Sequence, residues 1–198
     1  MRKILVLNRV TMDCMFAGPE GEIDWFVPDG ELDQKLFGEQ KVGAPDTVLF
    51  GRTTYEMFES YWPKIAEGET DLEYAPSENE ALSAERKIAD MLTKMTKIVV
   101  SHKPRQFTWK NSEMLEGELV EGVKKLKASK GGDIIIFGSG TIIQQLQNAN
   151  LIDDYWLILT PVVLGNGKPQ FEGVERFNLE LVSSEAFASG NILAHYKA

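Results

Sequence analysis

DIIIFGSGTIIQQL, residues 133–146, combines a strand, a glycine turn and a helix in one short stretch. Ile134–Phe137 has the length and β-branched composition of a strand buried on both faces, and the apolar residues after Gly138–Gly140 keep the spacing of one helical stripe. Such a junction directs backbone N–H groups and the positive end of a helix dipole to one point, which suits a phosphate. A plain β-to-α connection whose glycines only permit a tight turn fits the same letters, so other residues must decide.

A second junction of the same kind occupies residues 46–56. An expected strand, Asp46–Phe50, leads through Gly51 into a helix that begins with Arg52, Thr53 and Thr54. The planar guanidinium of Arg52 is suited to hold a phosphate, and the two threonines offer hydroxyl and N–H groups. The alternative is that Thr53 is only an N-cap and that Glu56 completes a capping box. The two interpretations are compatible.

Strands alternate with helices along the rest of the chain. We expect strands at 3–10, 97–101, 134–137 and 155–160, and helices near 32–37, 80–92, 119–126 and 140–150. The acidic stretch 62–79 is expected to be a mobile surface excursion, and 179–187 with 191–196 a terminal hairpin. The pattern predicts a single α/β domain over residues 1–198, with a mostly parallel sheet that ends in antiparallel strands.

Composition excludes several classes of protein. Cys14 is the one cysteine among 198 residues, so no disulfide forms within the chain, and no segment reaches the roughly 20 apolar residues of a membrane span. The net charge of −9, from 30 acidic and 21 basic residues, opposes general binding to nucleic acid or to an anionic membrane. We therefore expect a soluble cytoplasmic protein that binds neither nucleic acid nor membrane.

Several well-known motifs are absent. The dinucleotide fingerprint is half met, because Ile143 stands at its third glycine, and a nucleoside-triphosphate loop would need lysine where Gln144 stands. His102 and His195 have no cysteine or carboxylate at metal-ligand spacing, so no metal site is predicted. The glycine turn therefore belongs to neither of those phosphate-binding folds.

Other polar residues follow the expected strands. Ser101, His102 and Lys103 come directly after a buried strand, where an α/β sheet usually binds ligands, although a solvated basic turn is the simpler reading. Asp13 and Asp29 lie near the first strand and its loop, and either could supply a proton if burial raises its pKa. Trp25 could stack on a ring of the substrate or belong to the core, and the core is the more common place for it.

Five stretches in order resemble the dihydrofolate reductase superfamily, in particular small proteins grouped with the reductase domain of riboflavin-biosynthesis deaminase-reductases. They are TMDCMFAGPEGEIDWF (11–26), DTVLFGRTTYEMF (46–58), KIVVSHK (97–103), IIIFGSGTIIQQL (134–146) and LIDDYWLILTPVVLGNGKPQF (151–171). The resemblance implies a three-layer dihydrofolate-reductase-like fold, NADPH as cofactor and a homodimer.

The resemblance also implies roles for matching residues. Gly51–Thr54 would lie at the cofactor's phosphates, and Ser101–Lys103 around the adenosine end with its 2′-phosphate. The pyrophosphate would be held by Gly138, Ser139, Gly140, Thr141 and Ile142. Asn8 to Asp13 and Ala17 to Gly18 would border the nicotinamide, and Asn8, Trp25 and Asp29 would contact the substrate.

The expected function is therefore the NADPH-dependent reduction of a small heterocycle of pterin or pyrimidine type, with 5-amino-6-(5-phosphoribosylamino)uracil reductase as one model. One alternative is a protein that binds the dinucleotide without turning it over. Another is a structural homodimer without ligand, in which 161–167 and the strand before it form the interface.

Overall fold

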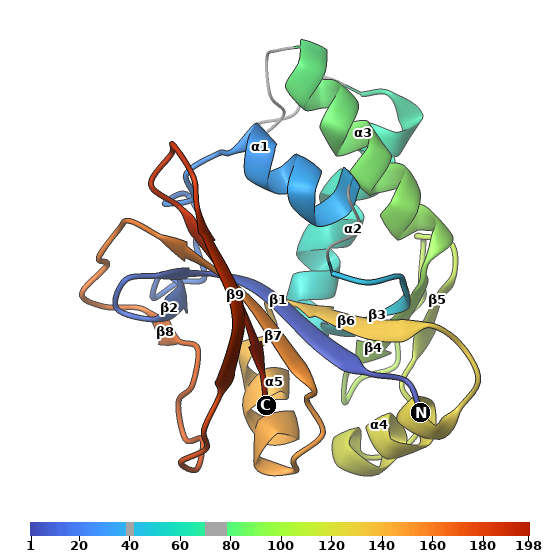
Figure 1. Ribbon diagram of the computed structural model, residues 1–198. Coiled ribbons are helices and arrows are strands. Elements are labelled where there is room, and N and C mark those ends of the chain that lie inside the picture. The colour runs from blue at the N-terminus through green and yellow to red at the C-terminus, as the bar shows by residue number, and fades with distance from the viewer. Residues whose placement is uncertain (39–41, 70–78) are drawn as a thin grey trace.

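An eight-stranded sheet forms the centre of the protein over the residues that the computed structural model describes, 1–38, 42–69 and 79–198 (Figure 1). From one edge to the other its strands are β5 (Ser112–Met114), β4 (Thr96–Val100), β3 (Pro45–Gly51), β6 (Asp133–Phe137), β1 (Ile4–Thr11), β7 (Asp154–Thr160), β10 (Ile192–Lys197) and β9 (Glu180–Ala186). The six from β5 to β7 pair in parallel, and β10 and β9 pair antiparallel. The predicted mostly parallel sheet with a terminal hairpin is confirmed.

Helices cover both faces of this sheet (Figure 1). On one face lie α1 (Gly30–Asp33), the π-helical turn η1 (Gln34–Gly38), α2 (Arg52–Glu67) and α3 (Asn79–Lys94). On the other lie α4 (Leu119–Ala128) and α5 (Gly140–Asn148). Because side chains alternate along a strand, Leu5 and Leu7 of β1 pack under the first group of helices, while Ile4 and Val6 pack under the second.

The structure corrects the expected surface excursion at 62–79. Residues 62–67 continue α2 despite Pro63, because Ile65 is fully buried and Trp62 packs against the core. Packing of α2 against α3 therefore outweighs the lost N–H and the usual cost of an internal proline. Gly68 is the C-cap of α2 and Asn79 begins α3, while residues 70–78 of the expected excursion lie outside the described residues.

Three short strands were not predicted. β5 extends the parallel sheet at its edge, and β2 (Met15–Ala17) pairs antiparallel with β8 (Lys168–Pro169) in a separate two-stranded sheet. Strands of two or three residues carry too few side chains for a recognisable alternation. The β2–β8 pair holds the loop after β1 beside the segment that follows β7.

None of the described helices is both long and apolar enough to cross a membrane.

Candidate functional site

The two strand–glycine–helix junctions meet at the carboxyl edge of the sheet, the edge where β1, β3, β4 and β6 end. Strands β3 and β6 are neighbours, yet α2 leaves β3 towards one face and α5 leaves β6 towards the other. Where the two helices diverge, the backbone N–H of Gly51 donates to the Ser139 hydroxyl over 2.9 Å, and that hydroxyl donates to Thr54 Oγ1 over 3.1 Å. In open α/β sheets such a change of face is where ligands bind.

The two helices that begin at these junctions, α2 and α5, have uncapped N-termini. Their N-cap residues are Gly51 and Ser139, neither makes a side-chain capping bond, and neither helix has an acidic residue in its first turn. Helix α1 differs, because Asp29 caps it. The first N–H groups of a helix have no partner within it, so α2 and α5 direct free donors and two positive dipole ends at one place. The capping-box interpretation of Thr53 and Glu56 is wrong.

The glycine turn has a shape that few other residues tolerate. Gly138 has φ +57°, and a Cβ there would lie 3.2 Å from Thr54 Cγ2. Ser139 is itself left-handed, with φ +54°. A Cβ on Gly140 would lie 2.4 Å from the Phe16 ring, so the loop after β1 packs directly on the start of α5. Ser139 adopts a conformation that costs an L-residue free energy, and its hydroxyl joins the two junctions.

Asn8 and Ile142, two residues of the predicted site, contact the glycine turn from the protein interior. Asn8 is buried, its Oδ1 accepts from Gly138 N over 2.6 Å, and its amide donates to Gln170 Oε1 over 2.8 Å. Ile142 packs in the core, and its N–H donates to the Ser139 carbonyl over 2.9 Å. The Asn8 side chain and the Ile142 N–H therefore hold the turn in place. Free donors at the start of α5 come from Gly140 and Thr141.

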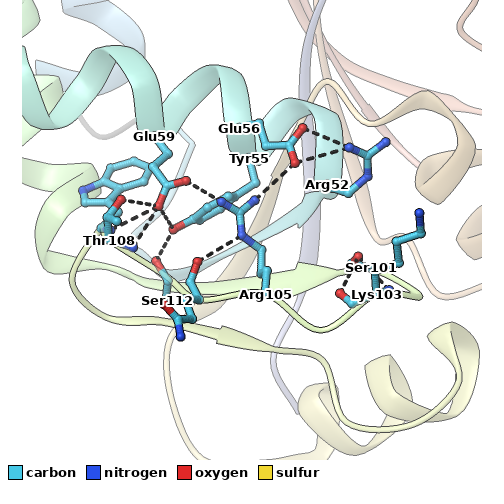
Figure 2. Close-up of polar contacts among 11 residues, drawn as sticks. Arg52, Tyr55, Glu56, Glu59, Ser101, Lys103, Arg105, Thr108 and Ser112 are labelled. Carbon is cyan, nitrogen blue, oxygen red and sulfur yellow. Dashed lines mark hydrogen bonds and ion pairs between the residues drawn. The ribbon is translucent and has the colours of Figure 1, made fainter.

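The segment 101–103 lies next to the second junction along the same edge. Gly51 pairs with Val100, which places Ser101 beside Arg52. The Ser101 hydroxyl accepts from Lys103 N over 3.1 Å and donates to Lys103 O over 3.0 Å (Figure 2). His102 and Lys103 are exposed. Within the described chain, no hydrogen bond or ion pair joins this turn to either junction. It adds exposed positive charge to the edge without closing a pocket.

The structure does not meet the condition under which Asp13 or Asp29 would supply a proton. The Thr11 hydroxyl and the N–H of Gly165 hold the pKa of Asp13 below its usual value. Burial by itself would raise the pKa of Asp29, but hydrogen bonds from the Ser189 hydroxyl and from Leu32 N leave it lowered. Both groups are anchoring carboxylates, Asp13 for the loop at 164–165 and Asp29 for α1.

Asp33 has the property that was expected of those residues, and the sequence did not single it out. It ends α1 and pairs with Arg9 across 2.9 Å. Burial raises the pKa of Asp33 despite this guanidinium. Arg9 follows Leu5 and Leu7 on the α1 face of β1, one residue beyond Asn8, and lies 5.5 Å from the centre of the Phe26 ring. A charge in the apolar alternation of a buried strand was the available signal.

Trp25 belongs to the interior. Its side chain is 9% exposed and meets the Phe26 ring edge-on, with 4.7 Å between ring centres. Its indole N–H has no hydrogen-bond partner among the described residues. Burial of the ring leaves it little surface with which to stack on a substrate.

A family model and two curated proteins match nearly the whole chain. A family model described as the RibD C-terminal domain matches residues 2–193. The uncharacterized protein YyaP of Bacillus subtilis (strain 168) is 30% identical over 202 residues, which covers 98% of this chain and 94% of that protein. The uncharacterized protein YwjB of the same strain is 25% identical, with 98% and 97% of the two chains covered.

Two solved structures have a similar fold. A protein assigned to riboflavin biosynthesis from Shewanella sp. PV-4 superimposes with a TM-score of 0.70 and 21% identity, over 100% of this chain and 98% of that one. A diaminohydroxyphosphoribosylaminopyrimidine deaminase/5-amino-6-(5-phosphoribosylamino)uracil reductase from Thermotoga maritima gives 0.64 and 15%, over 99% of this chain and 56% of that one. At these identities the likeness concerns the fold.

Proposed function

This chain belongs to the RibD C-terminal domain family, and from that premise we propose that the protein is an NADPH-dependent reductase of a small heterocyclic compound of pterin or pyrimidine type. The observation that carries the proposal is the contact of Gly51 and Thr54 with the Ser139 hydroxyl. It brings two uncapped helix N-termini together at the carboxyl edge of the sheet. That arrangement has the chemistry of a pyrophosphate site.

The residues of this edge divide into groups with different tasks. Donors at the starts of α2 and α5 would hold the pyrophosphate, and Arg52 would add a charge-assisted hydrogen bond to a phosphate oxygen. Ser101–Lys103 would lie at the adenosine end. Asn8 fixes the turn, and Phe16 covers the first residue of α5. Hydride donation is the chemistry that NADPH supplies when bound, so these residues need only bind it, orient it and exclude water.

We propose that Asp33 places the substrate and supplies its proton. The side chain is two-thirds buried, its pKa is raised by burial, and Arg9 fixes it on the α1 face near the end of β1. A carboxyl that retains its proton closer to neutral pH is a better general acid than the anchored Asp13 or Asp29.

NADPH titration of the intact protein tests the proposal. We expect energy transfer from tryptophan to bound NADPH and thermal stabilisation by it, and both should weaken in Arg52→Met. The matched control is Lys124→Met, which removes another exposed cation paired with a glutamate on its own helix. Absence of binding at millimolar NADPH would overturn the proposal.

A panel of pterins, pyrimidines and quinones then separates turnover from binding. Oxidation of NADPH with at least one of them supports a reductase. The second candidate is a dinucleotide-binding protein without turnover, and binding without oxidation across the panel would support it. If Arg52→Met changes no measurable property, the structural homodimer is the better account.

A further inference from the structure

Helix α2 begins with a cation at the wrong end of its dipole. Arg52 is the first residue of α2, where the macrodipole is positive and disfavours a guanidinium. Its Nη1 is hydrogen-bonded to both carboxylate oxygens of Glu56 one turn later, at 3.3 and 3.1 Å. Both side chains are about half exposed, so the ion pair changes the folding equilibrium by only about two- to threefold. The Glu56 carboxylate therefore compensates the positive charge of Arg52 only weakly, and a stronger anion at the start of α2 would be favoured.

Arg105, in the segment after β4, lies near Glu56 as well and is held by a different glutamate, Glu59. Arg105 Nη2 pairs with Glu59 Oε2 at 2.5 Å, and its guanidinium lies 4.6 Å from the centre of the Tyr55 ring (Figure 2). Glu59 in turn accepts hydrogen bonds from Tyr55, Thr108 and Trp109. Arg105 is thus fixed in place.

One nitrogen of this fixed guanidinium lacks a hydrogen bond. Arg105 Nη1 is buried without a hydrogen-bond partner in the described part of the chain, and it lies 3.5 Å from Glu56 Oε1. Figure 2 shows the Glu56 carboxylate between the guanidinium groups of Arg52 and Arg105. A small movement of Glu56 towards Arg105 would supply the missing bond and would release Arg52.

We infer that Glu56 occupies Arg52 in place of a cofactor phosphate and moves onto Arg105 when a phosphate binds. This inference rests on the proposed function and extends it to a residue that sets cofactor affinity. Glu56 is a positioning residue, because it acts through Arg52. In the free protein it neutralises the cation at the start of α2. In the bound protein the buried Nη1 of Arg105 accommodates its charge, which limits the repulsion between carboxylate and phosphate.

The sign of one affinity change tests the inference. For unit charges about 6 Å apart in a largely solvated setting, with an effective dielectric constant of about 40 to 80, loss of one repulsion changes the binding equilibrium about three- to tenfold. Glu56→Gln should therefore bind NADPH about three- to tenfold more tightly than the wild type, measured by quenching of tryptophan fluorescence. Glu121→Gln, which removes an exposed glutamate paired with Lys124 on α4, should bind like the wild type. If Glu56 merely held Arg52 in position, Glu56→Gln would bind NADPH more weakly than the wild type.

The outcomes separate the two proposals. If wild-type protein does not bind NADPH, the proposed function fails and this inference with it. If the wild type binds but Glu56→Gln and Glu56→Ala bind equally or more weakly while still folded, only the inference fails. A structure of the wild-type complex with NADPH gives a second readout: Glu56 should be hydrogen-bonded to Arg105 Nη1 and Arg52 to a phosphate oxygen. Glu56 still bonded to Arg52 would overturn the inference.

Discussion

Replacement of Ser139 by alanine should weaken the contact between the two junctions by a calculable amount. The Ser139 hydroxyl is 8% exposed as part of its residue, accepts from Gly51 N over 2.9 Å and donates to Thr54 Oγ1 over 3.1 Å. An unsatisfied, partly buried N–H costs about 1 to 3 kcal/mol, and loss of a hydroxyl pair at a half-buried threonine adds about 0.5 kcal/mol. We expect Ser139→Ala to lower the free energy of unfolding by about 2 kcal/mol.

Glycine at the same position separates the hydrogen bonds from the backbone strain. Ser139→Gly loses the same hydroxyl but removes the cost of φ +54°, which is about 1 to 2 kcal/mol for an L-residue and is partly offset by glycine's greater entropy when unfolded. The glycine variant should therefore be about 1 kcal/mol more stable than the alanine variant and still less stable than the wild type.

Urea titration followed by tryptophan fluorescence measures both differences. With a slope of about 2 to 3 kcal/mol/M for a chain of this size, Ser139→Ala should lower the midpoint by about 0.7 to 1 M without changing the slope. Thr53→Ala, which removes the exposed hydroxyl next to Thr54, should stay within about 0.5 kcal/mol of the wild type. An alanine variant as stable as the wild type would contradict the stabilising role of the Ser139 hydroxyl, and one more stable than the glycine variant would contradict the backbone strain at this position.

Three further predictions follow from other groups. Burial by itself would raise the pKa of Glu59, but hydrogen bonds from Thr108, Trp109 and Tyr55 outweigh it and leave the pKa below 4.5. The stability that the ionised carboxylate contributes is therefore full above pH 4.5 and is lost as the pH falls through the lowered pKa. Glu59→Gln should lower the free energy of unfolding by about 1 to 3 kcal/mol near neutral pH. In urea titrations from pH 7 to 3 its deficit should shrink on acidification, and a constant deficit would contradict this. Asp33→Asn should lower kcat with an accepted substrate at least tenfold and leave the Kd for NADPH unchanged; a changed Kd with unchanged kcat would exclude the proton-donor role. Sedimentation at micromolar concentration should give twice the mass of one chain, and a monomer would end the homodimer prediction.

The order of the main strands and helices was predictable because their side chains are sorted by burial. The isoleucines of β6 and the alternating residues of β1 are buried on the faces that periodicity assigns to them. Glycine positions identified both junctions, since a turn between a buried strand and a helix needs a positive φ or a close approach. Pro63 was misleading, because a local signal cannot register the burial of Ile65 two residues later.

The candidate site was predicted in part, and the missing part depends on tertiary contacts. That Gly51 and Gly138–Gly140 lie at one edge follows from a parallel sheet, but the bond through the Ser139 hydroxyl does not. The sequence also could not distinguish the carboxylates: Asp29 is a helix cap with a lowered pKa, while burial raises the pKa of Asp33. Both lie around α1, and the difference arises from the residues packed on each, Ser189 and Arg9.

Amide chemical shifts recorded during an NADPH titration would show which backbone N–H groups receive the pyrophosphate. We expect saturable shifts that are largest for Arg52, Thr53, Thr54, Gly140 and Thr141, the first free donors of α2 and α5. Shifts confined to other parts of the sheet, or none at saturating NADPH, would contradict it.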